Sequence, residues 1–192
     1  MEENTLTQVN KLLIAGGSSG SMEVILEFLP LLKRNLSIAI VIVLHRKNFS
    51  DSALIELFSS KTFLPVKEAE DKEIIKQSVI YVASADYHLL IEKNKTFSLD
   101  YSEKINYSRP SIDVSFESAA DTFKENVVGL LLSGANADGA DGLAAIKQCN
   151  GITAVQDPAT ASVPFMPKYA MERIKIDYIL KPSQMADFIN EI

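Results

Sequence analysis

Residues 37–45 read SIAIVIVLH, an unbroken run of apolar and mostly β-branched side chains that ends in a histidine. A strand that is covered on one face alternates between apolar and polar residues, whereas a strand that is buried on both faces does not. The run is far too short to span a bilayer, which needs about 20 apolar residues. It therefore predicts a parallel strand with helices packed on both faces of its sheet.

Similar buried runs lie on either side of this stretch, at residues 11–16 (KLLIAG) and 127–134 (VVGLLLSG). Residues 21–34 between the first two strands have helical spacing, and Pro30 is expected to bend or interrupt that helix. Further helices are predicted from Ser50 or Asp51 through Phe58, from about Ser111 to Lys124, from Asp138 to Gln148, and from about Ser183, with further strands at 152–157 (ITAVQD) and 177–182 (DYILKP).

The middle of the chain has a different pattern. Residues 78–84, 88–92 and 96–101 are strand-like, and residues 93–95 between the last two predict a hairpin connection. The alternation of strands and helices with one hairpin predicts an α/β fold. We expect a three-layer α/β/α sandwich with a mostly parallel, doubly wound sheet and an antiparallel hairpin insertion.

Composition places the chain among ordinary globular domains. Its 192 residues are 47% apolar and 23% charged, which is enough for one hydrophobic core. The sequence has no internal repeat, linker or break in composition. Residues 11–192 are therefore expected to form one domain behind a short N-terminal extension, residues 1–10.

Charge and residue types exclude several functions. The net charge is −6 and the basic residues are scattered, which disfavours nucleic acid and anionic membranes as partners. The single cysteine, Cys149, cannot form an internal disulfide and is expected to be a small buried residue at a helix end. One cysteine and two histidines are a poor metal-ligand set, so no metal site is expected. The polar N-terminus does not resemble a signal peptide, which predicts a cytoplasmic protein without membrane insertion.

Three chemically active side chains follow the predicted buried strands. Sites in open parallel sheets form beyond the carboxyl ends of the strands. Ser18 follows the first strand, His45 ends the second and Asp138 follows the third. A serine hydroxyl needs a base to take its proton, and the base needs a group that fixes its tautomer and stabilises its cation. The sequence therefore predicts a catalytic triad of nucleophile, base and acid.

Residues 16–20 (GGSSG) also match G-x-S-x-G, which places the central serine on a tight strand-to-helix turn near backbone N–H groups. Gly17, Ser19 and Ala135 are the candidate residues for an oxyanion hole or for substrate positioning. The motif alone is weak, because glycine-rich turns also bind phosphate or merely close a loop. No histidine follows Asp138, so the α/β-hydrolase order of serine, acid and histidine is excluded.

Each triad position has a rival. His88 is the other histidine, but it lies between two predicted strands and is expected to pack locally, away from Ser18. Asp141 competes with Asp138 for the acid, and Ser19 competes for the nucleophile. The proposed base and acid also have structural interpretations, as a strand-end histidine and as a helix N-cap.

Four ordered segments resemble the signature blocks of the chemotaxis protein-glutamate methylesterases. They are IAGGSSGS (14–21), LHRKNFS (44–50), RPSIDVSF (109–116) and LLSGANADGADGL (131–143), and IYVASADYHLLIE (80–92) and QDPATASVPFMPKYA (156–170) are similar to the family as well. The resemblance covers nearly the whole chain from Lys11 onward. Four blocks in the same order are far more specific than any single motif.

The resemblance implies a serine hydrolase whose nucleophile, histidine and aspartate fall on Ser18, His45 and Asp138. The implied reaction hydrolyses glutamate γ-methyl esters on a methylated chemoreceptor or a related signalling protein, releases methanol, needs no cofactor, and in some members extends to glutamine deamidation. The departures from the family pattern are Ser19 for the common threonine, Ser21 for a glycine, Arg46-Lys47 after the histidine, and Ala137 for the asparagine before the catalytic aspartate.

Family members commonly carry an N-terminal receiver domain, and only residues 1–10 precede the first predicted strand here. We therefore expect no receiver domain and no control by phosphorylation within this chain. An alternative is an inactive or adaptor-type domain that binds a receptor or methyltransferase without catalysis. A nucleotide-binding domain is a third hypothesis, but the glycine-rich turn lacks the P-loop G-K-[ST] and the G-x-G-x-x-G spacing. The sequence does not indicate the oligomeric state.

Overall fold

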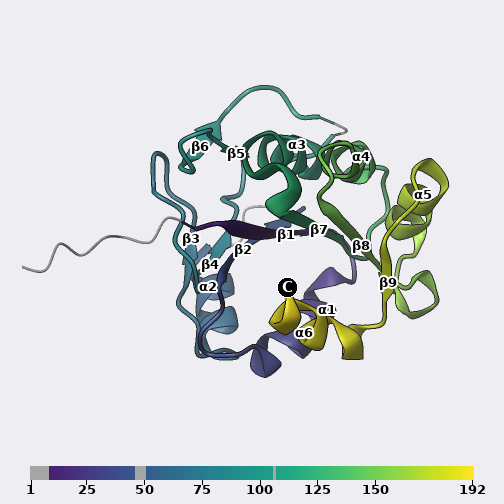
Figure 1. The fold of residues 1–192 in the computed structure, drawn as a ribbon, viewed down its shortest axis with the longest axis horizontal. Coiled ribbons are helices and arrows are strands. Elements are labelled where there is room, and N and C mark those ends of the chain that lie inside the picture. Colours follow the sequence, from purple (N-terminus) through teal and green to yellow (C-terminus); the bar gives the residue numbers. More distant parts are fainter. Residues whose placement is uncertain (1–8, 46–50, 106) are drawn as a thin grey trace, which may run out of the picture.

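The computed structural model describes residues 9–45, 51–105 and 107–192, which form a seven-stranded sheet between helices and a separate hairpin (Figure 1). Every neighbouring pair of strands in the large sheet is parallel. This confirms the predicted three-layer α/β/α sandwich. In sheet order the strands are β3 (Val66–Glu68), β4 (Ile80–Val82), β2 (Ile38–Leu44), β1 (Lys11–Gly17), β7 (Val127–Leu131), β8 (Ile152–Gln156) and β9 (Tyr178–Leu180).

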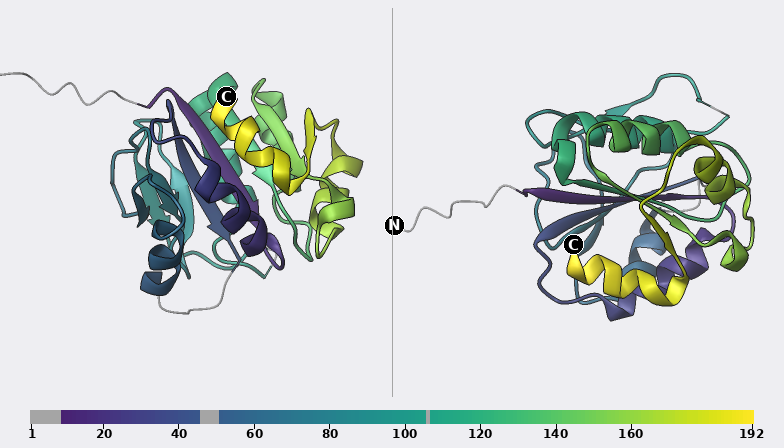
Figure 2. Two further views of the ribbon diagram at one scale, coloured as in Figure 1. Left: turned by 90° about the horizontal axis from the view of Figure 1, so that it is seen from below. Right: turned by 45° about the vertical axis from the view of Figure 1, so that its right-hand side comes forward.

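The helices cover both faces of the sheet, which Figure 2 shows edge-on in its right-hand view. One face carries the hairpin and the helices α3 (Ile112–Phe123), α4 (Ala140–Gln148) and α5 (Phe165–Arg173). The other face carries α1 (Ser21–Phe28), α2 (Asp51–Ser59) and α6 (Pro182–Glu191). Within the part of the chain that the structure describes, none of these helices is long and apolar enough to cross a membrane.

The central strands are buried on both sides, as their continuous apolar runs predict. Successive side chains of a strand point to opposite faces of the sheet. Leu12 and Ile14 of β1 belong to the core beneath α3 and α4, whereas Leu13 and Ala15 belong to the core beneath α1 and α6. All residues of β2 are buried. Two apolar layers therefore hold the middle of the sheet, and its strand ends are fixed in space.

The hairpin consists of β5 (His88–Ile91) and β6 (Phe97–Asp100), which pair antiparallel as predicted. It packs against α3 on one face of the sandwich. Leu89 and Phe97 are fully buried in the core that includes α3, and the hydroxyl of Ser115 donates a hydrogen bond to the carbonyl of Leu89 at 2.8 Å. The hairpin thus supports the helix whose first turn reaches the candidate site.

Local signals set several helix ends. Ser111 is the N-cap of α3, and its Oγ accepts a hydrogen bond from the N–H of Val114 at 3.4 Å. After α1 the chain continues as a short 3₁₀ turn, Leu29–Leu31, because Pro30 cannot donate to an α-helical ladder. The expected N-cap Ser50 lies outside the described residues.

One predicted helix start is wrong by two residues. Helix α4 begins at Ala140 and not at Asp138, because Gly139 adopts a left-handed conformation with φ of 96° and forms the N-cap. Asp138 therefore does not cap its own helix, and its side chain is available to another partner. Cys149 lies at the C-terminal end of α4, as expected, and is half-buried.

Candidate active site

The carboxyl ends of β2, β1 and β7 lie side by side at one edge of the sheet. Gly17 at the end of β1 pairs with Leu44 at the end of β2, so the residues that follow, Ser18 and His45, leave the sheet at the same level. The N–H of His45 donates to the carbonyl of Gly17 at 3.1 Å, and the N–H of Ser18 donates to the carbonyl of Ser133 at 2.9 Å. These hydrogen bonds fix the backbone of Ser18 between the other two strand ends.

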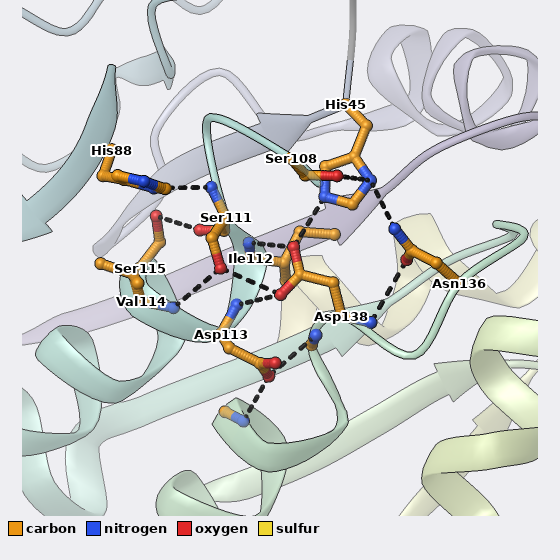
Figure 3. Close-up of polar contacts among 12 residues, drawn as sticks. His45, His88, Ser108, Ser111, Ile112, Asp113, Val114, Ser115, Asn136 and Asp138 are labelled. Carbon is orange, nitrogen blue, oxygen red and sulfur yellow. Dashed lines mark hydrogen bonds and ion pairs between the residues drawn. The ribbon is translucent and has the colours of Figure 1, made fainter. Parts of the chain in front are cut away.

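His45 and Asp138 form a close pair (Figure 3). The Nε2 atom of His45 lies 2.7 Å from Oδ2 of Asp138, and the two side chains are 10% and 0% exposed. A carboxylate can only accept, so this contact places the ring proton on Nε2 and leaves Nδ1 as the basic nitrogen. Nδ1 lies 3.3 Å from Oγ of Ser108 and 3.5 Å from the side-chain nitrogen of Asn136.

Three further donors surround the Asp138 carboxylate, and all come from the start of α3. They are the hydroxyl of Ser111 at 3.0 Å, the N–H of Ile112 at 2.7 Å and the N–H of Asp113 at 2.9 Å. The first N–H groups of a helix lack intrahelical acceptors, and the helix dipole favours an anion there. Asp138 thus precedes α4 but caps α3.

These contacts determine the charge of Asp138. Burial alone would raise its pKa, but the hydrogen bond from His45 and those from the N–H groups of Asp113 and Ile112 outweigh burial, so the pKa lies below its usual range. The carboxylate is therefore ionised at neutral pH. An ionised carboxylate at this position can orient the imidazole and stabilise the imidazolium that forms when His45 takes a proton.

The structure separates the two candidate acids. Asp141 lies in the first turn of α4 with its side chain 60% exposed, and it forms an ion pair with Arg173 of α5 at 2.6 Å. Asp138 is fully buried against the imidazole. Asp138, and not Asp141, is thus the carboxylate that can act on His45.

His88 has a local role, as expected. It is 1% exposed, its Nδ1 accepts a hydrogen bond from the N–H of Ser111 at 3.1 Å, and its Nε2 lies 2.9 Å from the carbonyl of Glu103. Because Nδ1 accepts, Nε2 must carry the proton and the ring is neutral. His88 therefore supports the N-terminus of α3.

Ser18 lies on a tight turn between β1 and α1. Its carbonyl accepts hydrogen bonds from the N–H of Ser21 at 3.1 Å and from the hydroxyl of Ser21 at 2.5 Å. Gly20, the N-cap of α1, has φ of 82°, a conformation that favours glycine. The turn therefore presents Ser18 at the positive end of α1, close to the N–H groups that start this helix.

Hydrogen bonds from a buried polar network support this turn. The hydroxyl of Ser133 donates to the carbonyl of Ser19 at 2.7 Å, and the N–H of Ser133 donates to the side-chain oxygen of Gln156 at 3.0 Å. Ser133 and Gln156 are both fully buried. A Cβ atom at Gly134 would lie 3.1 Å from Cβ of Ser18, so a larger residue would crowd the serine.

The structure brings two members of the predicted triad into contact and places the third on the adjacent strand end. Within the described residues, the hydrogen-bond partners of the His45 ring are Asp138, Ser108 and Asn136, and the hydroxyl of Ser18 is not among them. Catalytic hydrogen bonds are often loose before substrate binds. The contact between Ser18 and His45 stays a prediction, and Ser108 becomes a rival hydroxyl.

The other predicted positions lie at the same edge. Ser19 and Ala135 are exposed on the turns after β1 and β7, whereas Gly17 is buried at the end of β1. Sequence reasoning missed the contributions of Ser108, Ser111 and Asp113. The segment RPSIDVSF holds the last two and was noted only as a family block, so a polar pair at a predicted helix start is the signal that could have identified them.

Comparisons with known proteins point to one family. The sequence profile described as CheB methylesterase matches residues 13–189. A protein of Leptospira interrogans is 43% identical over 175 residues, which are 91% of both chains. A protein-glutamate methylesterase/protein-glutamine glutaminase of Thermotoga maritima is 31% identical over 95% of this chain, and the match spans 54% of that protein.

A solved structure shares the fold. The crystal structure of the Thermotoga maritima CheB methylesterase catalytic domain superposes with a TM-score of 0.91 at 32% sequence identity. The match covers 95% of this chain and 98% of that domain. With a family profile and a solved domain both matching almost from end to end, the chain belongs to the CheB methylesterase family.

Proposed function

We propose that this protein hydrolyses the γ-methyl esters of glutamate side chains on chemoreceptor-like signalling proteins in the cytoplasm, and that it also deamidates glutamine side chains. The observation that carries the proposal is the His45–Asp138 pair at 2.7 Å, set beside Ser18 at the carboxyl edge of the sheet. The membership of the chain in the CheB methylesterase family and the names of its relatives support the same activity.

In the proposed mechanism Ser18 Oγ attacks the ester carbonyl carbon while Nδ1 of His45 takes the hydroxyl proton. The buried Asp138 carboxylate stabilises the resulting imidazolium. The carbonyl oxygen becomes an oxyanion, and the N-terminus of α1 with the backbone around Ser19 and Ala135 is the proposed site that receives it.

The tetrahedral intermediate then collapses. His45 returns its proton to the methoxy oxygen, methanol leaves, and an ester bond joins Ser18 to the substrate carbonyl. A water molecule attacks this acyl-enzyme with His45 again as base, and the products are a glutamate carboxylate and free Ser18. For glutamine the leaving group is ammonia in place of methanol. Each step uses only groups of the protein, side chains and backbone N–H groups, together with water.

Ser18 is favoured over Ser108 by its surroundings. Ser18 lies at the start of a helix, where N–H groups and the helix dipole stabilise developing negative charge. Ser108 lies in the loop before α3 and pairs through its backbone with Ile105. We assign Ser108 the role of holding the His45 ring until substrate brings Ser18 into line.

Active-site labelling tests the proposal. A serine-reactive phosphonate should label the intact protein at one peptide, residues around Ser18, and the protein should release methanol from methylated receptor fragments. Asp138→Asn should slow the labelling, because the base is no longer oriented. Labelling of the Ser108 peptide would move the nucleophile. A protein that takes no label and releases no methanol would favour the adaptor alternative.

A further inference from the structure

Helices α3 and α4 start side by side, and each is capped by a carboxylate that stands at the start of the other (Figure 3). Asp138, just before α4, accepts the first N–H groups of α3. Asp113, in the first turn of α3, accepts the N–H of Gly139 at 2.8 Å and that of Gly142 at 2.7 Å. The two caps lock the loop that carries Asp138 onto the start of α3.

Both carboxyl groups are buried, with Asp138 0% and Asp113 8% exposed. The N–H of Asp113 donates to Asp138, so the two residues are in direct contact. Two adjacent buried carboxylates repel each other, and the one with weaker support keeps a proton. Asp138 has four donors, including His45, whereas Asp113 has two.

These hydrogen bonds indicate that Asp113 is the carboxyl group that keeps a proton. Its two backbone donors both reach Oδ1, so a proton on Oδ2 leaves both hydrogen bonds in place. Burial, with the charge of Asp138 adding to it and the N–H of Gly142 opposing it, raises the pKa of Asp113 to about 7. Asp113 therefore changes charge in the range where a histidine base works.

We propose that Asp113 is a positioning residue for the hydrolase reaction: its carboxyl group fixes the loop that holds Asp138, and its ionisation adds a second negative charge behind the His45–Asp138 pair. This inference rests on the proposed function, because it concerns the same site. The added charge favours the imidazolium of His45, and so it favours the transition state in which His45 has taken a proton.

The other charged groups near Asp113 do not supply this second negative charge behind the His45–Asp138 pair. Asp141 is paired with Arg173 at the surface, and His88 is a neutral ring that accepts from the N–H of Ser111. The pKa of Glu117, one turn further along α3, is raised by its own burial and then by the charges of other acidic residues. Asp113 interacts electrostatically with Asp138 and with Arg173. The other titratable groups on the elements around it are His45, His88, Glu117 and Asp141.

The test replaces the ionisable oxygen and keeps the cap. Asp113→Asn retains one oxygen for the N–H groups of Gly139 and Gly142 but cannot ionise. Asp121→Asn is the matched control, because Asp121 lies on the same helix with its side chain 77% exposed and a weak contact of 3.8 Å to Lys124. Methanol release by both variants and by the unmodified protein is measured from pH 5.5 to 9.

We expect the kcat/KM of the unmodified protein to rise gradually with pH on the acidic side of its profile, because two coupled groups lose protons there. In Asp113→Asn the rise of kcat/KM with pH should follow the loss of a single proton and have its midpoint at lower pH. In the same variant, kcat at pH 8.5 should fall roughly three- to thirtyfold while KM stays unchanged. Asp121→Asn should match the unmodified protein. An Asp113→Asn profile that matches it as well would overturn the proposal.

A second measurement needs no turnover. The chain has two histidines, so NMR of the ring signals can follow His45 directly, and ¹³C labelling of aspartate follows the carboxyl group of Asp113 in the unmodified protein. We expect one aspartate to titrate near neutral pH and the His45 ring signals to shift together with it, and both changes to be absent in Asp113→Asn. If every aspartate titrates in the ordinary acidic range, the inference is wrong. If these shifts occur while methanol release is absent, the coupling stands and the proposed function fails.

Discussion

The two sides of the site differ in how firmly they are held. On the carboxylate side, Asp138 is fully buried and accepts four hydrogen bonds, one from His45 and three from the start of α3. On the hydroxyl side, Ser18 is half-buried and its backbone is fixed, but its hydroxyl does not reach the imidazole in the described structure. Ser108 fills that position on the ring.

This difference shows which residues of the proposed triad are oriented by the fold and which one is not. The proposed acid and base are oriented by the fold itself, since the same hydrogen bonds that cap α3 also fix Asp138. Among the described contacts, Ser18, the proposed nucleophile, is held through its main chain, so in the proposed mechanism substrate binding completes the alignment. Remote binding energy from an extended protein substrate can supply this alignment.

The largest expected effect is the loss of the nucleophile. Ser18→Ala should lower methanol release by roughly 10⁴- to 10⁶-fold while leaving the fold intact, because removal of a triad member abolishes the acyl-enzyme route. The measurement is turnover of methylated receptor fragments, with circular dichroism as the check on folding. Retained activity here together with loss in Ser19→Ala would place the nucleophile one residue later.

The next effect concerns the rigid side. Asp138→Asn should lower kcat by roughly 10⁴-fold, because the neutral amide no longer fixes the ring tautomer or stabilises the imidazolium. Asp141→Asn, which removes a charge three residues away, should change kcat by less than about twofold, since it breaks only a surface ion pair. The reverse ranking in steady-state kinetics would contradict the assignment of the acid.

A smaller effect should come from the residue that occupies the ring before substrate binds. Ser108→Ala removes one hydrogen bond to Nδ1 of His45, so the expected change in kcat/KM is roughly two- to tenfold. Asn136 remains beside the same nitrogen. A loss as large as that of Ser18→Ala would show that Ser108 is itself the nucleophile.

The smallest effect is on stability. The folded pKa of Asp113 is about 7 against an ordinary value of 3.8, so between these pH values the folded chain binds more protons than the unfolded chain and its stability falls as pH rises. Asp113→Asn cannot lose that proton. Its melting temperature relative to the unmodified protein should therefore rise by roughly 2–8 °C between pH 5 and pH 8. Calorimetry at the two pH values checks this, and an unchanged difference would contradict the buried titration.

Much of the fold could be predicted because the central strands are long, apolar and buried on both faces. Once those runs were placed, the position of Ser18, His45 and Asp138 followed from the ends of parallel strands. Strand β3 could not be predicted, because its three residues Val66–Glu68 are half-buried and mostly polar. Helix α5 was missed as well, since it begins in a stretch rich in proline.

The hydrogen-bond partners in the site were harder to predict. Apolar periodicity shows which face of α3 is buried, but it does not show which carboxylate meets its N-terminus. Asp138 was expected to start its own helix, whereas the left-handed Gly139 turns the chain and sends the carboxylate to α3. The proposed role of Asp113 was hard to predict for the same reason, because α3 and α4 are far apart in the sequence and come together only in the folded chain.

The buried network of Ser133 and Gln156 has a consequence for protein engineering. Ser133, just after β7, and Gln156, at the end of β8, anchor the Ser18 turn through hydrogen bonds that do not involve the loop that carries Ser108. That loop borders the imidazole and is largely exposed. We expect a library that randomises residues 101–105 while keeping Ser133 and Gln156 to vary the exposed surface beside the imidazole and to leave the Ser18 turn unchanged.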